Sequence, residues 1–241
     1  MNELVSIIIP VFNHAHALER SFKTIFSQTY RPFHIIIVDD GSTDNFNQVI
    51  TKLSQSTWFK PLDTKTIHQA NKGAAMARNR GFKESAGDYV IFWDADTIAE
   101  PEMLEKMSQA LKEHSEASYA YSQFRFGWKK FKCQPFNAED LKKNNYVDTT
   151  SLIRREALKN IPEPFDESLK RFQDWDLWLT LLEHNKTGTF VPEVLYRKIV
   201  SGRKGMSAWL PRFVYRLPWR SYQVNEYEAA QKIILRKHHL V

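Results

Sequence analysis

Residues 35–44 read Ile-Ile-Ile-Val-Asp-Asp-Gly-Ser-Thr-Asp, and the expected fold depends on this stretch. Its first four residues are all apolar, as is typical of a short strand buried on both faces of a parallel sheet. The strand is expected to end at Asp39-Asp40, because adjacent carboxylates are costly to bury without a cation or a hydrogen-bond donor. Gly41-Ser42-Thr43-Asp44 then predicts a turn into a helix over roughly 44–54, with Asp44 as its cap.

The alternation of strand and helix continues through the first 120 residues. Further strands are expected over Leu4–Pro10, Thr64–His68 and Tyr89–Trp93, and helices over 14–28, from about 73 to 86, and from Pro101 onward. This βαβα order predicts an α/β fold with a Rossmann-like sheet, mixed but mainly parallel, that is flanked by helices. Ligands of such folds bind at the carboxyl ends of the strands.

The regular alternation is lost after about residue 122. Val147–Ile153 is expected to be a strand, Asp174–Glu183 a helix, and Lys129–Lys132 a basic patch. We interpret this half as an elaboration packed on the same sheet. With 42% hydrophobic residues, the 241-residue chain can build a sizeable core.

The positive charge is concentrated near the C-terminus. The net charge is +6, yet from Arg197 onward there are ten Lys and Arg against two Glu. Trp209, Phe213, Tyr215 and Trp219 are interleaved there with Arg212, Arg216 and Arg220. This pattern suits an anionic membrane surface or a lipid-phosphate acceptor, with a packed surface segment or an oligomer contact as alternatives. Nucleic acid is not an expected partner, because no recognition motif accompanies the charge.

Three features bear on location. Cys133 is the only cysteine, which fits a reducing compartment. The N-terminus lacks the basic region and cleavage site of a signal peptide, and no apolar run approaches the roughly 20 residues that span a bilayer. We therefore expect a cytoplasmic protein, with peripheral contact to the inner face of the membrane through the C-terminal extension as an open alternative.

Two acidic clusters, Asp39-Asp40 and Asp94-Ala95-Asp96, directly follow apolar strands. Both should lie at the same edge of a parallel sheet and share one cleft. Their hard carboxylate oxygens suit Mg²⁺ or Mn²⁺ with open positions for diphosphate oxygens. Helix capping explains Asp96 equally well when that residue is taken alone, and the parallel position of Asp40 favours a binding site.

Two later segments add candidate binding residues. Asn71–Gly81 opens a helix with glycine, small residues and cations, so Lys72 or Arg78 could pair with a diphosphate. Gln173–Trp178 alternates Asp174 and Asp176 with two tryptophans. Capping is the simple interpretation of these acids, whereas aromatic faces beside a carboxylate would suit a sugar and a general base.

Taken together, the segments resemble family 2 glycosyltransferases of the GT-A fold. The matching pieces occur in the order of the family: Val5–Asn13, Ile37–Asp44, Asn71–Gly73 with Ala77–Asn79, Asp94–Asp96, Phe165–Glu167, Asp174–Trp178 and Pro192–Arg197. The resemblance covers roughly residues 4–210. It implies a domain over 1–207, with a nucleotide-sugar-binding half (1–121) and an acceptor-binding half (122–207), followed by the extension 208–241.

The resemblance also implies roles for individual residues. The implied nucleotide-sugar-binding residues are Pro10, Phe12, Asn13, Asp40, Lys72, Arg78 and Asp94. Asp96 would hold Mn²⁺ or Mg²⁺, and Asp174 would be the general base, with Trp175 and Asp176 next to the acceptor. Two positions depart from the family pattern: Gln173 replaces a common glutamate, and 198–203 contains no histidine but does contain cations that could engage the diphosphate.

The implied activity is inverting transfer of a hexose from a nucleotide sugar, UDP-sugar being favoured, to an acceptor hydroxyl. The acceptor would be a cell-surface polysaccharide or a lipid-linked glycan. A sugar nucleotidyltransferase is the alternative enzyme, although Pro10-Val11-Phe12-Asn13 stands where its Gly-rich phosphate loop is expected. A catalytically inactive sugar-nucleotide-binding or scaffolding partner is the alternative outside enzymes. The chain has no G-x-G-x-x-G motif, which disfavours a dehydrogenase. The oligomeric state is not predicted.

Overall fold

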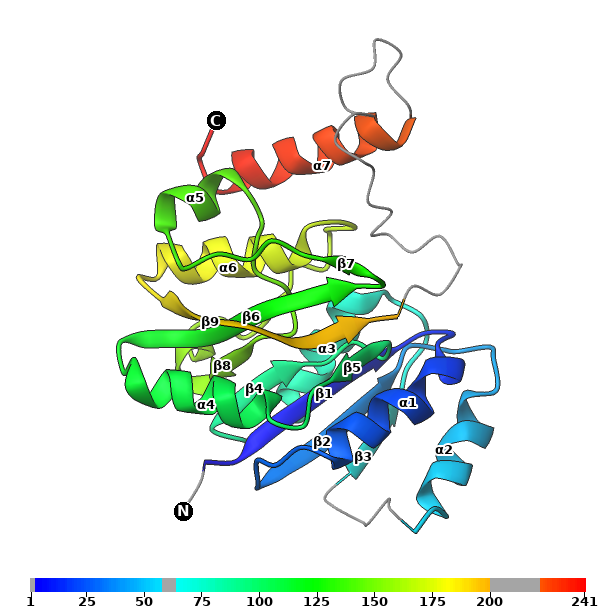
Figure 1. The fold of residues 1–241 in the computed structure, drawn as a ribbon. Coiled ribbons are helices and arrows are strands. Elements are labelled where there is room, and N and C mark those ends of the chain that lie inside the picture. Colours follow the sequence, from blue (N-terminus) through cyan, green and yellow to red (C-terminus); the bar gives the residue numbers. More distant parts are fainter. Residues whose placement is uncertain (1–2, 58–63, 200–221) are drawn as a thin grey trace.

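A nine-stranded mixed sheet organises the computed structural model, which describes residues 3–57, 64–199 and 222–241 (Figure 1). Its strands are β1 (Val5–Val11), β2 (Phe33–Asp39), β3 (Thr64–His68), β4 (Tyr89–Phe92), β5 (Thr97–Ala99), β6 (Ala117–Phe126), β7 (Lys129–Lys130), β8 (Leu152–Arg154) and β9 (Thr187–Lys198). The order across the sheet is β3-β2-β1-β4-β8-β6-β9-β5, with β7 paired to β6.

The first four strands form the parallel part of the sheet. β1 lies between β2 and β4, and β2 pairs with β3, all in parallel. Ile7, Ile8 and Ile9 of β1 are fully buried, because side chains on both faces of this central strand are covered. Each such burial contributes roughly 1.5–3 kcal/mol to folding. The parallel register places the ends of β1, β2 and β4 at one edge, as the sequence predicts.

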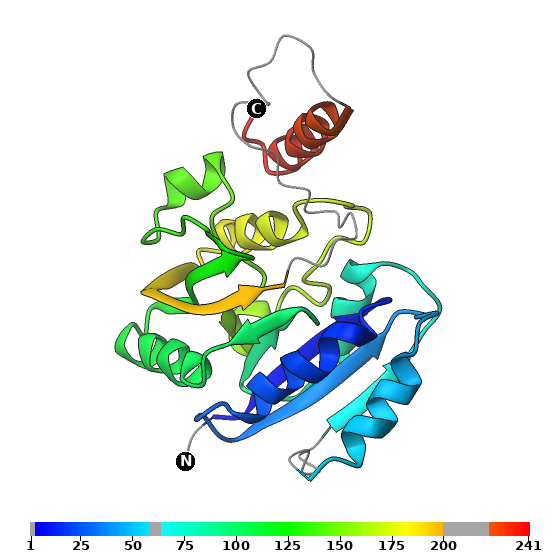
Figure 2. The same cartoon turned by 45° about the vertical axis from the view of Figure 1, so that its right-hand side comes forward.

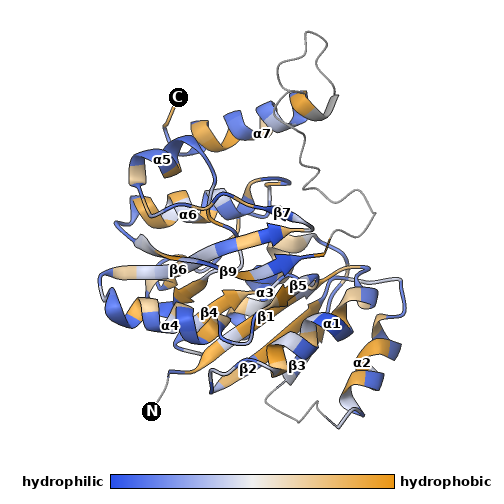
Figure 3. Ribbon diagram, in the orientation of Figure 1, coloured by the Kyte–Doolittle hydropathy of each residue, from blue (hydrophilic) through white to orange (hydrophobic). Residues whose placement is uncertain are grey.

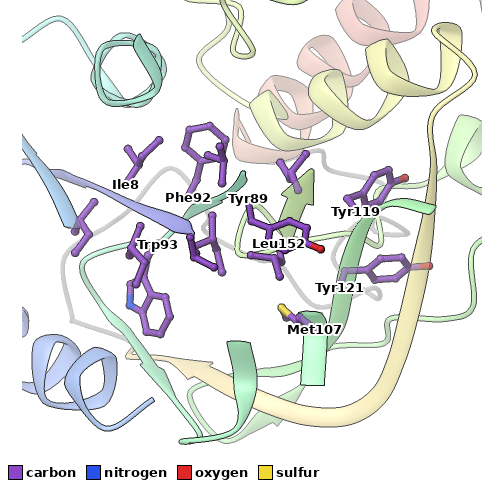
Figure 4. Packing of buried hydrophobic residues seen from close by; sticks show 14 of the residues in the cluster. Ile8, Tyr89, Phe92, Trp93, Met107, Tyr119, Tyr121 and Leu152 are labelled. Atoms are coloured by element: carbon purple, nitrogen blue, oxygen red, sulfur yellow. The ribbon is translucent and has the colours of Figure 1, made fainter. Parts of the chain in front are cut away.

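Helices cover both faces of the sheet (Figure 2). They are α1 (Ala15–Phe26), α2 (Phe46–Ser54), α3 (Ala74–Lys83), α4 (Met103–Glu113), α5 (Ala138–Lys143), α6 (Gln173–Glu183) and α7 (Tyr222–Lys237), with a 3₁₀ helix over Arg155–Leu158. Figure 4 shows Ile8 and Phe92 on the face of the sheet that α3 covers. Trp93 and Met107 lie on the opposite face of the sheet. The indole of Trp93 donates to Ser21 of α1, and Met107 belongs to α4.

The second half of the chain completes the same sheet. β8 pairs antiparallel with β4, and β6 pairs with both β8 and β9. α6 packs on β6 through Trp178, whose ring stacks on Tyr119 at 4.6 Å. The α/β fold and the packing of this half on one sheet are thus confirmed. The expected division at residues 121 and 122 falls inside β6.

Three local predictions differ from the structure. The strand expected over Val147–Ile153 is limited to β8, because Asp148 folds the segment back by accepting from the N–H of Thr150 and the hydroxyl of Ser151 binds its carbonyl. The helix expected from Pro101 begins at Met103. Asp44 does cap a helix, but it accepts from the N–H of Ala15 at the start of α1 rather than from α2.

The C-terminal extension is described only from residue 222, where α7 begins. The interleaved basic and aromatic residues between Trp209 and Arg220 lie outside the described residues. In Figure 1, α7 lies beyond α5 and α6, away from the parallel strands. Across the described ranges, no helix combines the length and apolar character that a membrane span requires.

Candidate active site

Loops at the carboxyl ends of β1 and β2 form a shared framework. Asn13, at φ 53°, accepts through Oδ1 from the N–H groups of Thr43 (2.8 Å) and Asp44 (3.2 Å). Its own N–H donates to the hydroxyl of Ser42 at 3.1 Å. These bonds fix the loop that carries Phe12, whose side chain is exposed. Pro10, another predicted donor-binding residue, is half-buried near the end of β1.

Asp40 ties this framework to the start of α3. Its carboxylate accepts from the side chain of Gln69 (2.8 Å) and from the N–H groups of Lys72 (2.9 Å) and Gly73 (2.8 Å). Gly73 has φ 95°, a conformation that favours glycine and turns the chain into the helix. Asp40 is buried and satisfied by these donors, so it shapes the loop that presents the exposed side chain of Lys72.

A charge cluster lies beside the end of β4. Asp94 accepts from Arg78 of α3 at 2.9 Å and from Lys198 of β9 at 2.8 Å. Lys198 also donates to Asp148 at 2.6 Å, and Asp148 accepts from the Tyr196 hydroxyl at 2.9 Å. We call Arg78, Asp94, Asp148, Tyr196 and Lys198 the charge cluster.

Protonation in this cluster is set by competition between burial and charge. Burial alone would raise the pKa of Asp94, but the charges of Lys198 and Arg78 hold that pKa well below its usual range. Burial would lower the pKa of Lys198, but Asp148 and Asp94 raise it. Asp94 is therefore ionised and Lys198 charged at neutral pH, and the cluster keeps fixed charges at the sheet edge.

Asp96 differs from Asp94 although only one residue separates them. Its carbonyl accepts from the N–H of Ile199 at 3.0 Å, while its carboxylate is half-buried. Burial and the nearby charge of Asp94 raise the pKa of Asp96 to about 6. Within the described ranges no three acids, cysteines or histidines come together as a metal site. Mg²⁺ and Mn²⁺ bound to a diphosphate need only one or two carboxylates, so Asp96 fits such an ion.

Asp174 lies in the first turn of α6, after Phe172 at φ 60°. Its carboxylate accepts from Asn145 at 2.9 Å and from the N–H of Trp175 at 2.9 Å. Burial raises the pKa of Asp174, and the negative charge of Asp148 adds to the shift. A carboxylate with a raised pKa is a better proton acceptor near neutral pH.

Arg78 connects the donor side of the site to α6. One guanidinium nitrogen donates to Asp94 and another donates to the side chain of Gln173 at 3.0 Å. Gln173 in turn donates to the carbonyl of Leu169. Thus Gln173, where the family commonly has glutamate, serves as a neutral acceptor for Arg78, and Asp174 keeps its place beside the charge cluster.

Trp175 and Asp176, predicted to contact the acceptor, point into the protein. Trp175 is 1% exposed and its indole donates to the carbonyl of Leu141. Asp176 is 2% exposed and accepts from His238 and Lys237 at the end of α7. Helical spacing turns both side chains away from Asp174, so neither offers a surface to an acceptor in this structure. The prediction that they bind the acceptor is not supported by their positions.

Sequence reasoning missed Asp148 and Asn145 and assigned Lys198 only as one of several cations. Asp148 stands in a segment expected as a strand, where an isolated acid gives no signal of its partners. Asn145 follows α5 and reaches Asp174 across 29 residues of sequence. The available sequence signal for Lys198 is its place directly after Tyr196-Arg197, where this segment lacks the histidine of the family pattern.

Carboxylates and fixed cations gather at the carboxyl ends of the parallel strands, which is the edge where α/β folds bind their ligands. Residues 6–162 match the model of glycosyl transferase family 2, and the chain belongs to this family. It is 29% identical over 231 residues to the putative teichuronic acid biosynthesis glycosyltransferase TuaG of Bacillus subtilis, covering 88% of this chain and 87% of TuaG. It is also 35% identical over 114 residues to GlyG of Streptococcus pneumoniae, covering 47% of this chain and 36% of GlyG. The match spans about a third of the length of several such relatives.

Solved structures share the fold. S. aureus TarS 1–349 in complex with UDP-GlcNAc superposes with a TM-score of 0.72 at 19% identity, covering 98% of this chain and 71% of TarS. The mannosyltransferase PcManGT of Pyrobaculum calidifontis, in complex with GDP-Man and Mn²⁺, gives 0.68 at 16% identity, covering 99% and 71%. The predicted GT-A fold is therefore confirmed.

Proposed function

We propose that this chain transfers a sugar from a nucleoside diphosphate sugar to an acceptor hydroxyl with inversion at the anomeric carbon, and that Asp174 is the general base. The observation that carries the proposal is the position of Asp174. Asn145 donates to its carboxylate, and burial raises its pKa. Its chain neighbour Gln173 accepts from Arg78, which also donates to Asp94 at the end of β4.

The donor would lie along the sheet edge. Phe12 and the Asn13 loop offer a surface for the base and ribose, and Lys72 and Arg78 offer cations for the diphosphate. Nε of Arg78 is buried without a partner among the described residues, which suits a ligand contact. A Mn²⁺ or Mg²⁺ ion held by Asp96 would supply further positive charge at the diphosphate.

The reaction needs one proton acceptor. Asp174 would take the proton of the acceptor hydroxyl while the hydroxyl oxygen bonds to the anomeric carbon. The bond from that carbon to the diphosphate oxygen breaks, and the electron pair leaves with the nucleoside diphosphate. The fixed charges of Arg78 and Lys198 favour the growing negative charge without rearrangement.

A UDP-sugar is the favoured donor, and a cell-surface polysaccharide the favoured acceptor. The first proposal is supported by the fold shared with TarS, which was crystallised with UDP-GlcNAc, and the second by the similarity to TuaG. GDP-Man in PcManGT keeps a GDP-sugar as the competing donor.

Asp174→Asn tests the base. Turnover should fall by about 10²–10⁴-fold while calorimetric affinity for the nucleoside diphosphate stays within about twofold, because the amide cannot accept the proton but fills the same space. Asp88→Asn, an exposed change at the opposite end of β4, is the matched control. Unchanged turnover in Asp174→Asn would sink the assignment. A parent chain that binds nucleotide and never turns over would favour the scaffolding alternative.

A further inference from the structure

The β6–β7 hairpin combines a fully exposed tryptophan with clustered cations. Trp128 is 91% exposed at the turn, next to Gly127 at φ 60°. The neighbouring exposed cations are Arg125, Lys129, Lys130, Lys132 and Arg197. We call these six side chains the basic hairpin. Figure 3 shows hydrophilic residues at β7, where this surface lies.

Strand pairing forces the cations together. Arg125 of β6 lies between Arg197 of β9 and Lys130 of β7 in the register of the sheet. Side chains of directly paired residues share a face about 5 Å apart, so three like charges are adjacent, an arrangement that is unfavourable by itself. The hairpin itself supplies no acid to relieve it, because no Asp or Glu occurs between Glu116 and Glu139. Glu193 of β9 is paired with Lys106 of α4.

Protection of a sheet edge explains only part of this surface. Lysines on an edge strand discourage pairing with other chains, and β7 pairs only with β6 among the described strands. An exposed tryptophan on the same edge works against that protection. Trp128 therefore calls for a partner that accepts an aromatic ring and cations together.

We propose that the basic hairpin docks on an anionic phospholipid surface. Tryptophan favours the interface between headgroups and acyl chains, and each Lys or Arg near an anionic leaflet strengthens binding. A glycan platform is less suitable, because a ring exposed to 91% has almost no neighbouring side chains to shape a hollow around a sugar. The exposure of Trp128 at the turn lets the ring enter a headgroup layer.

The position of the hairpin gives this contact a use. Phe126 pairs with Lys198, and the N–H of Gly127 donates to the carbonyl of Lys198 at 3.0 Å. Lys198 holds Asp94 of the charge cluster, so the hairpin starts one strand spacing from the proposed donor site. Docking at this corner would hold that site close to acceptors carried in or on the membrane.

The test is co-sedimentation of the full chain with vesicles. Phosphatidylglycerol–phosphatidylcholine vesicles are compared with pure phosphatidylcholine at low and high salt. The Lys129→Gln/Lys130→Gln/Lys132→Gln variant should lose roughly tenfold to a hundredfold in partitioning to the anionic vesicles. Trp128→Ala should also weaken it severalfold. All variants keep residues 200–241, so the differences report on the hairpin alone.

The matched control is Lys112→Gln/Lys159→Gln/Lys186→Gln, which removes the same charge at the opposite end of β6. It should keep at least half of the wild-type partitioning. Equal losses in both triple variants, or unchanged partitioning of the hairpin variants, would overturn the proposal. So would a Trp128→Ala protein that binds vesicles normally but loses retention on polygalacturonate, because the surface would then bind an anionic glycan.

Nucleoside diphosphate binding separates this proposal from the proposed function. The hairpin variants should bind the nucleotide like the wild type, because the altered side chains do not belong to the charge cluster. Loss of vesicle binding with normal nucleotide binding supports docking, whether or not turnover is detected. If the triple lysine variant loses both vesicle binding and nucleotide binding, its sheet edge is disturbed. Vesicle binding by Trp128→Ala then decides whether the hairpin docks on the membrane.

Discussion

Asp148 acts on the proposed base through its charge and on the charge cluster through its hydrogen bonds. Burial raises the pKa of Asp174 and the charge of Asp148 adds to the shift, while the carboxylate of Asp148 accepts from Lys198 at 2.6 Å. Asp174 must be ionised to act as a base, so kcat/KM should fall as the pH drops through its raised pKa.

Asp148→Asn should therefore move the acidic limb of the pH–kcat/KM profile to lower pH. Removing the negative charge beside Asp174 lowers the pKa of that base, so it stays ionised in more acidic solution. Maximal activity should also fall, because Lys198 loses one partner. The profile is measured from initial rates, with Asp88→Asn as control. A limb that stays in place or moves to higher pH would show that Asp148 does not act on the base.

The carboxylate of Asp96 should make nucleotide binding metal-dependent. In the wild type, calorimetric affinity for UDP or GDP should rise at least tenfold when Mn²⁺ is added and fall again with a chelator. Asp96→Asn should remove that increase while keeping the weaker metal-free binding. Equal Mn²⁺ dependence in both proteins would place the ion elsewhere. No nucleotide binding with or without Mn²⁺ would make Asp40 and Asp96 structural acids.

Among the elements, α7 is tied to α6 by charge. The imidazole of His238 lies between Asp176 at 2.9 Å and Glu183 at 2.8 Å, and Lys237 bonds both Asp166 and Asp176. Burial alone would lower the pKa of His238, but these hydrogen bonds to carboxylates raise it. The first turn of α6 thus has its base on one side and its α7 anchor on the other.

His238→Ala should destabilise the fold by about 1–3 kcal/mol at pH 6. The folded pKa is raised, so this contribution is fully present below the unfolded value of about 6.5 and is lost as the pH rises through the folded pKa. The difference in free energy of unfolding should therefore shrink in alkaline solution, as measured by denaturant titration. His16→Ala, an exposed change on α1, should cost less than about 0.5 kcal/mol at every pH. A pH-independent loss would contradict a charged His238.

The sequence predicts the elements of the parallel half better than those of the second half. Four-residue apolar runs such as Ile35–Val38 are typical of buried strands, and the acids that follow parallel strands meet at one edge of the sheet. Around Asp148, hydrogen bonds to Thr150 and Ser151 shorten the expected strand. The bond from Lys198, fifty residues away, is one that no local pattern reveals. Trp175 illustrates a site residue that the sequence predicts wrongly. An aromatic residue beside an acid resembles a sugar site, but the indole of Trp175 is buried against α5.

At the scale of the whole molecule, the two predicted halves share one sheet rather than forming separate units. β4 has β1 on one side and β8 on the other, and β5 pairs only with β9 among the described strands. A chain cut after residue 121 ends inside β6, so β4 loses its partner β8 and β5 loses its partner β9. The fragment 1–121 would then expose apolar residues of β4 and its end, including Phe92 and Trp93, which are fully buried in the whole chain.

The fragment 1–121 should therefore lack a cooperative thermal transition, whereas the whole chain should unfold in one step by far-UV circular dichroism and tryptophan fluorescence. A chain ending at residue 199 is the matched control, because it keeps every described strand and loses only the residues after β9 and Ile199. It should unfold cooperatively at a lower Tm than the whole chain, because Asp176 loses its partners Lys237 and His238. A sharp transition in 1–121, with nucleotide binding, would instead make that half an independent domain. In that case, the acceptor half would be an addition that the donor site does not need for its own structure.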